Sequence, residues 1–166
     1  MVYIESPQQY SPADGALSVF LAGGITGCPD WQSTMVALLA DTPLIVFNPR
    51  RAKFPMHDPS AAQAQIVWEY QYLRVVNMIL FWFPCDTLCP IVLYELGAWS
   101  MTKKPLLIGM HPDYQRRQDV EIQTRLARPG MCLFYSLDDL ARAVRAVSRE
   151  MPSYPRKETL DDHLWP

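Results

Sequence analysis

Two glutamates, Glu69 and Glu95, stand in stretches of the chain that are otherwise almost entirely apolar. Glu69 follows Ile-Val-Trp, and Glu95 lies within Pro-Ile-Val-Leu-Tyr-Glu-Leu-Gly-Ala-Trp. A buried ionised carboxylate is costly unless it is hydrogen-bonded or paired with a cation. One explanation is therefore that each acid pairs with an arginine such as Arg50 or Arg74. We favour a functional role, because two acids in such surroundings are both expected beside the ligand-binding edge of the sheet described below.

A pair of carboxylates in one site is suited to cleaving a C–N glycosidic bond. The reaction passes through an oxocarbenium-like transition state. One carboxylate can attack the anomeric carbon and form a covalent glycosyl intermediate, while the second acid handles the proton of the departing base. Two successive displacements would retain the configuration at that carbon.

The elements that must position these acids alternate between strands and helices. Short apolar runs predict five strands, at residues 17–22, 44–47, 78–83, 105–110 and 131–135. Capping residues and apolar periodicity predict helices at about residues 30–39, 60–76, 90–101 and from 136 onward. This alternation is typical of an α/β domain, here a single-domain three-layer sandwich with a five-stranded, mostly parallel sheet of flavodoxin or Rossmann type.

The predicted boundaries are an N-terminal extension (1–16), the α/β domain (17–150) and a C-terminal tail (151–166). Ligands of such sheets bind at the carboxyl ends of the strands, near the switch in strand order. Gly23 and Gly24 directly follow the first predicted strand. The Gly-Gly turn does not match the dinucleotide fingerprint G-x-G-x-x-G, and we expect no bound cofactor.

The charge of the chain bears on its partners. A formal net charge of −2 argues against a nucleic-acid polymer, which would need a clustered basic face. The local cluster of Arg116, Arg117, Arg125 and Arg128 is interpreted as a solvated, salt-bridging helix face. No apolar run of about 18 residues predicts a membrane span. The first residues lack the pattern of a secretion signal, so a cytoplasmic location is expected.

The cysteines give no indication of a metal site. They are Cys28, Cys85, Cys89 and Cys132, and no two have C-x-x-C spacing. The three histidines are distant from them and from one another in sequence. We therefore expect reduced thiols and no bound metal.

Three segments of the chain resemble the nucleoside 2-deoxyribosyltransferases, in the broad group that includes 2′-deoxynucleoside 5′-phosphate N-hydrolases. Val19–Ile25 (Val-Phe-Leu-Ala-Gly-Gly-Ile) is similar to the first strand and substrate loop of that family. The segment from Glu69 to Phe83 is similar to its acid-bearing helix and third strand. Tyr94–Ala98 (Tyr-Glu-Leu-Gly-Ala) resembles the nucleophile motif and is the most specific of the three.

The resemblance implies roles for individual residues. Glu95 corresponds to the nucleophile, and Glu69 to an acid that contacts the base and assists proton transfer. Gly23, Gly24 and Ile25 correspond to the loop that approaches the sugar. The resemblance also implies a nucleoside or nucleotide and a free nucleobase as small-molecule ligands, and a homo-oligomer whose subunits complete each other's sites.

The base-binding side of the site is expected after the second predicted strand. The resemblance places Asn48 and Arg50 there, lining the base pocket. Arg50 could also receive a 5′-phosphate, although a surface arginine is the simpler interpretation. Trp31 is the tryptophan best placed to stack on a nucleobase, although a core position is the commoner role of this residue.

The chain departs from the family at three expected substrate contacts. Phe20 stands where a tyrosine hydroxyl commonly supports the nucleophile, and Glu69 is one methylene longer than the usual aspartate. Cys89 stands where transferases often have an aspartate and the phosphate-dependent hydrolases a serine. Three functions therefore remain open: sugar transfer between bases, hydrolysis of a nucleoside 5′-monophosphate, and nucleotide binding without catalysis.

Overall fold

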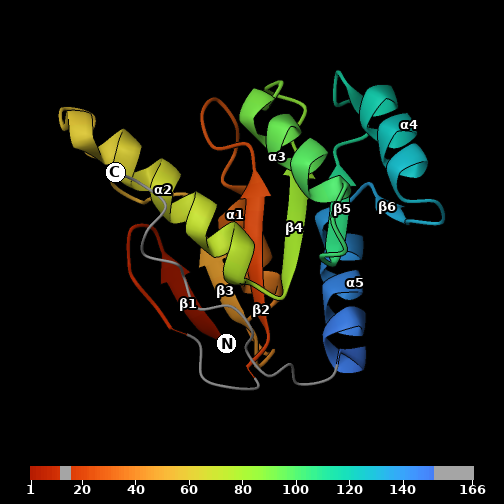
Figure 1. Cartoon of the computed structure of the whole chain (residues 1–166), viewed down its shortest axis with the longest axis horizontal. Coiled ribbons are helices and arrows are strands. Elements are labelled where there is room, and N and C mark those ends of the chain that lie inside the picture. Colours follow the sequence, from red (N-terminus) through yellow and green to blue (C-terminus); the bar gives the residue numbers. More distant parts are fainter. Residues whose placement is uncertain (12–15, 152–166) are drawn as a thin grey trace.

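The computed structural model describes residues 1–11 and 16–151 and contains one sheet of parallel strands in the order β1-β3-β2-β4-β5-β6 (Figure 1). The strands are β1 (Val2–Glu5), β2 (Ser18–Gly23), β3 (Ile45–Asn48), β4 (Met78–Phe83), β5 (Leu106–Met110) and β6 (Leu133–Phe134). All four residues of β3 and all six of β2 and β4 are buried, as expected for strands covered on both faces.

Helices cover both faces of the sheet. The helices α1 (Trp31–Leu38) and α5 (Leu137–Glu150) pack on one face, and α2 (Pro59–Val75), α3 (Pro90–Ser100) and α4 (Arg117–Ala127) pack on the other. Alternate residues of β2 supply the two cores, since Val19 faces α1 and Phe20 faces α2. Within residues 1–11 and 16–151, no helix is long and apolar enough to cross a membrane.

The predicted α/β class with a single parallel sheet is confirmed, but the sheet has six strands rather than five. The additional strand is β1, which lies along β3 with Val2 opposite Ile45 and falls inside the segment predicted as an extension. Only Ile4 of its four residues is buried, because an edge strand has a neighbour on one side only. Its apolar run, Met1–Ile4, is short and leads directly into the polar stretch rich in Ser, Pro and Gln that was predicted as an extension.

The arginine cluster predicted as a salt-bridging helix face is confirmed for α4. Arg116 lies 3.5 Å from Asp119, and Glu121 lies 3.5 Å from Arg117 and 3.8 Å from Arg125. Arg128 is the exception, because it turns away from this face and donates hydrogen bonds elsewhere.

Arg128 and Lys104 bind the carboxyl ends of α3 and α2. The guanidinium of Arg128 donates to the carbonyl oxygens of Ser100 at 3.0 Å, Trp99 at 2.9 Å and Lys104 at 2.8 Å. The ammonium of Lys104 donates to carbonyl oxygens at the end of α2, including that of Leu73 at 3.0 Å. These cations satisfy helix-end carbonyls that have no partner within the helix.

Candidate active site

The strand order changes direction at β2. The chain passes from β2 to β3 on one side and then to β4 on the other, so a crevice forms where β2 and β4 end. A cavity of about 650 Å³ lies there, walled by the end of β2 and its following loop, by α2, and by α3 with the loop before it. This volume falls within the range of small-molecule sites, roughly 300–1,000 Å³.

Glu69 from α2 and Glu95 from α3 both line this cavity. Neither has an ion-pair partner among the residues that the structure describes, which excludes pairing with the two arginines considered above. Arg50 instead lies 3.8 Å from Asp30, and Arg74 donates a hydrogen bond of 2.8 Å to the hydroxyl of Tyr70. The two carboxyl groups are therefore left to face the cavity together.

Burial perturbs both acids, and the charge of Glu69 perturbs Glu95 as well. Burial, and then the charge of Glu69, raise the pKa of Glu95 to about 8. Burial also raises the pKa of Glu69, while a hydrogen bond from Gln65 opposes the rise. Interacting acids lose their protons in steps that belong to the pair. Below about pH 8 the pair retains at least one proton, which suits it to work with one carboxylate and one carboxylic acid.

The loop after β2 is fixed from behind by the start of α1. Gly23, Gly24 and Ile25 line the cavity, as predicted for the substrate loop. The indole of Trp31 donates a hydrogen bond of 2.9 Å to the carbonyl oxygen of Gly24, and the amide of Gln32 donates a second one of 3.1 Å. Trp31 is buried in the core and does not line the cavity, so it supports the loop from the side opposite the cavity.

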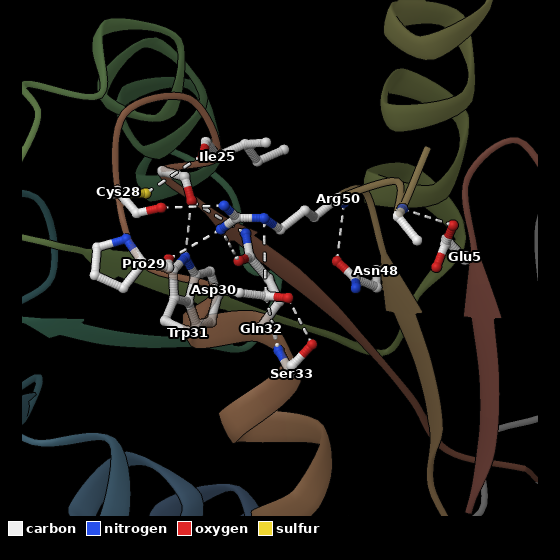
Figure 2. A network of polar contacts seen from close by, with 12 residues as sticks. Glu5, Ile25, Cys28, Pro29, Asp30, Trp31, Gln32, Ser33, Asn48 and Arg50 are labelled. Atoms are coloured by element: carbon white, nitrogen blue, oxygen red, sulfur yellow. Dashed lines mark hydrogen bonds and ion pairs between the residues drawn. The ribbon is translucent and has the colours of Figure 1, made fainter. Parts of the chain in front are cut away.

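Arg50 holds the same loop further along the chain. Figure 2 shows its guanidinium reaching the Cys28–Gln32 segment, where it donates to the carbonyl oxygens of Cys28 at 3.0 Å and Pro29 at 2.9 Å. Asn48 accepts from the backbone N–H of Arg50 at 2.9 Å. Neither Arg50 nor Asn48 lines the cavity, whereas Pro49 between them does. Their role as ligand contacts stays a prediction.

Phe20 and Cys89 both line the cavity and are both buried. Cys89 has a left-handed backbone with φ of 50° and precedes α3 without capping it through its side chain. Burial, followed by the nearby Cys28, raises the pKa of the Cys89 thiol to about 12. Cys89 is therefore a neutral thiol at physiological pH, and with Phe20 it makes this part of the cavity less polar.

Sequence reasoning did not identify several cavity residues on the two acid-bearing helices. Trp68 and Tyr72 are the residues of α2 that pack against the sheet. Ile66 and Tyr70 line the cavity instead, and they are 64% and 47% exposed. On α3, Tyr94 lines the cavity beside the predicted nucleophile and is 79% exposed. Apolar spacing along a helix predicts which residues share one face of that helix. It does not show whether this face packs against the sheet or lines the cavity.

No group of three or more His, Cys, Asp or Glu side chains that could hold a metal ion occurs within residues 1–11 and 16–151. His163 and the predicted C-terminal tail beyond Met151 lie outside the described residues.

Gly23→Ala should damage the end of β2 and the loop that follows it. A Cβ at position 23 would lie 2.3 Å from the indole of Trp31 and 2.5 Å from the backbone oxygen of Trp82. Because a central strand cannot move away, we expect a destabilisation of about 1–3 kcal/mol, measured by urea unfolding. Gly97→Ala in α3 is the matched control, since nothing lies within 4 Å of its added Cβ. It should stabilise the protein by about 0.5–1 kcal/mol. Equal effects at the two positions would contradict the close packing at Gly23.

One family model matches the chain. It is described as nucleoside 2-deoxyribosyltransferase like, and it matches residues 16–114, which include β2 to β5 and both cavity glutamates. Comparison with curated proteins finds no match.

Proposed function

Since the chain belongs to the nucleoside 2-deoxyribosyltransferase-like family, we propose that it cleaves the N-glycosidic bond of a nucleoside, with a 2′-deoxynucleoside as the preferred donor, and passes the sugar to another base. The observation that carries this proposal is the presence of two carboxyl groups without cation partners in one cavity of the described chain.

Glu95 is the nucleophile in the first step. Its carboxylate oxygen forms a bond to the anomeric carbon while the bond from that carbon to the base nitrogen breaks. The electron pair of the broken bond leaves with the base, which takes a proton from Glu69. The sugar is then held on Glu95 as an ester, and Glu69 is ionised.

The second step reverses these roles with a new base. Glu69 removes a proton from the incoming base, whose nitrogen attacks the anomeric carbon and releases the carboxylate of Glu95. Each step inverts the configuration at the anomeric carbon, so the product has the configuration of the substrate. The pair returns to its starting state with one proton. Because the pKa of Glu95 is raised to about 8, this proton rests mainly on Glu95, and the reactive form is the one in which it lies on Glu69.

The charge of the cavity favours a nucleoside over its 5′-monophosphate. Among the described lining residues Arg74 is the only basic one. Its guanidinium donates a hydrogen bond to the hydroxyl of Tyr70 and lies over the ring of that residue. A phosphate dianion would therefore enter beside two acids with little compensation. Hydrolysis of a monophosphate is the second candidate, and nucleotide binding without turnover is the third.

Transfer is tested by incubating the protein with a deoxynucleoside and an isotope-labelled free base. Labelled nucleoside should form, and the unphosphorylated donor should turn over faster than its 5′-monophosphate. Release of free sugar phosphate without base exchange would support the hydrolase instead. Thermal stabilisation by nucleotides with no turnover of any donor would support a binding protein and contradict the proposed enzyme.

The rate of exchange should depend on pH with a maximum between two limbs. Only the singly protonated pair has both a nucleophile and an acid. The raised pKa of Glu95, about 8, means that the last proton leaves near pH 8, so the rate should fall above it. At low pH both acids take up protons and the nucleophile is lost. Initial rates at low substrate concentration between pH 5 and 10 measure both limbs.

Glu69→Gln is the control for this profile. The variant has no acid to lose, so its alkaline limb should disappear. The midpoint of its acid limb should report Glu95 alone, and it should lie below pH 8 because the charge of Glu69 no longer raises that pKa. If the wild-type rate did not change between pH 5 and 10, this result would contradict the proposal that the active form has one proton on the pair of glutamates.

A homo-oligomer belongs to the same proposal. Apolar side chains at the cavity are strongly exposed in the single chain, namely Tyr94 at 79%, Ile91 at 65% and Ile66 at 64%. Contact with a second subunit would remove this apolar surface from water. Light scattering after size-exclusion chromatography measures the mass, and a monomer at assay concentration would contradict this part.

A further inference from the structure

Gln65 lies one helical turn before Glu69 on α2, and the proposed mechanism gives it no role. Its amide nitrogen donates a hydrogen bond of 2.7 Å to Oε1 of Glu69 and another of 2.6 Å to the carbonyl oxygen of Pro49. Its amide oxygen accepts a hydrogen bond of 2.6 Å from the hydroxyl of Ser6. Gln65 therefore connects Glu69 to the segments that follow β1 and β3.

The orientation of the Gln65 amide is determined by one of its partners. The carbonyl oxygen of Pro49 can only accept, so the amide group that faces it must be the NH₂. The second N–H then points to Glu69, and the amide oxygen is left for the hydroxyl of Ser6. Ser6 is itself buried, and its backbone N–H donates to the carbonyl oxygen of Asn48 at 3.0 Å.

This arrangement makes the two oxygens of Glu69 unequal. Oε1 accepts the N–H of Gln65, and the unprotonated oxygen of a carboxylic acid is the better acceptor of the two. Oε2 has no hydrogen bond to any residue that the structure describes. A proton on Glu69 is therefore favoured on Oε2.

We propose that Gln65 is a positioning residue, which occupies Oε1 of Glu69 and leaves Oε2 as the oxygen that exchanges a proton with the nucleobase. This inference rests on the proposed function. It assigns the proton transfer to one atom and explains how the long side chain of Glu69 is held in one orientation. The same N–H favours the charged form of Glu69 and so lowers its pKa against the effect of burial.

Other titratable groups near Glu69 must be considered in a pH experiment. Glu95, Cys89 and Tyr94 line the cavity from α3 and the loop before it, and Tyr70 and Arg74 line it from α2 itself. The cavity residues from β2 and its loop, and Pro49, carry no titratable side chain. Glu95 is therefore the acid whose titration must be separated from that of Glu69.

The experiment replaces Gln65 with Met, which keeps an unbranched chain and removes both donors. Gln63→Met is the matched control, because Gln63 is an exposed glutamine on the same helix. Gln65→Met should lower kcat by about 10- to 100-fold with little change in KM. The acid limb of its pH profile should move to higher pH, because Glu69 loses a donor to its charged form. Gln63→Met should change neither quantity.

A second readout does not depend on turnover. In the Glu95→Gln background, ¹³C NMR of the Glu69 carboxyl group follows its titration without the coupled acid. The pKa of Glu69 should rise on Gln65→Met and stay unchanged on Gln63→Met. Gln65→Glu, which keeps the shape but cannot donate when ionised, should raise it as well and serves if the Met variant does not fold.

The outcomes separate this inference from the proposed function. A wild-type protein that transfers bases, with a Gln65→Met variant of unchanged pH profile and unchanged Glu69 titration, would overturn the role of Gln65 alone. A uniform loss of rate at every pH would assign Gln65 a purely structural role and also overturn it. If the wild-type protein transfers no base, the proposed function fails, and the role of Gln65 in proton exchange fails with it even where the NMR shift is present.

Discussion

Replacing Glu95 with glutamine is expected to abolish base exchange, with a fall in rate of about 10³-fold or more, because the variant lacks the proposed nucleophile and Glu69 is needed as the proton donor. The amide keeps the shape of the side chain but is a poor nucleophile. A 2′-fluoro nucleoside, which slows release of the sugar, should add one sugar to the wild-type protein and none to the variant. Intact-protein mass spectrometry measures this, and peptide mapping identifies the modified residue.

The same variant should be more stable than the wild-type protein. The pKa of Glu95 is about 8 in the folded chain and ordinary in the unfolded chain, so the unfolded state releases a proton that the folded state holds. This proton release lowers the free energy of unfolding progressively as pH rises from about 5 to 8. Above that range the loss of stability stays constant. Glu95→Gln removes this loss of stability. The difference in Tm between the variant and the wild-type protein should therefore increase between pH 5 and 8. An inactive variant that is also less stable would point to misfolding instead of a lost nucleophile.

Replacing Glu69 with alanine should have the second largest effect, and its size should depend on the departing base. General acid catalysis contributes about 10²–10⁴-fold when a poor leaving group must be protonated. Donors with bases that leave readily as anions need little protonation, so their rates should fall much less. Steady-state rates across a series of donors whose bases differ in basicity measure this dependence.

An equal loss for every donor in that series would contradict the acid role of Glu69. It would instead indicate that Glu69 only shapes the cavity or binds the base. Glu69→Gln separates these possibilities further, because it retains hydrogen bonding to a base but cannot supply a proton under ordinary conditions.

The buried strands of the fold could be predicted closely from the sequence. β4 was predicted with its observed bounds, Met78–Phe83, because an apolar run buried on both faces ends abruptly at Pro84. Pro90 and Ser136 also marked helix starts correctly, the first at the initial turn of α3 and the second as the N-cap of α5. β1 could not be predicted in the same way, since its stability comes from pairing with β3, a partner distant in sequence.

The candidate site was predicted in part. Glu69 and Glu95 were singled out because an acid in apolar sequence demands an explanation, and both line the cavity. Trp31 was expected close to the Gly-Gly loop and Arg50 in a base pocket after the second predicted strand. Whether a side chain faces a ligand or supports the backbone depends on packing between distant segments. Gln65 carried no signal in the sequence, since a glutamine on a helix is ordinary until its partners are known.

The binding of Arg128 and Lys104 to the ends of α3 and α2 makes the segment from Trp99 to Lys104 a shared support for both glutamates. Each helix carries one acid toward the cavity and is held at its far end by this segment. The separation of the two carboxyl groups, and with it the size of the group that fits between them, thus depends on this segment, in which Trp99 lines the cavity and the residues from Ser100 to Lys104 do not. Directed evolution toward larger or smaller bases should accordingly select substitutions in this segment as well as in the cavity wall.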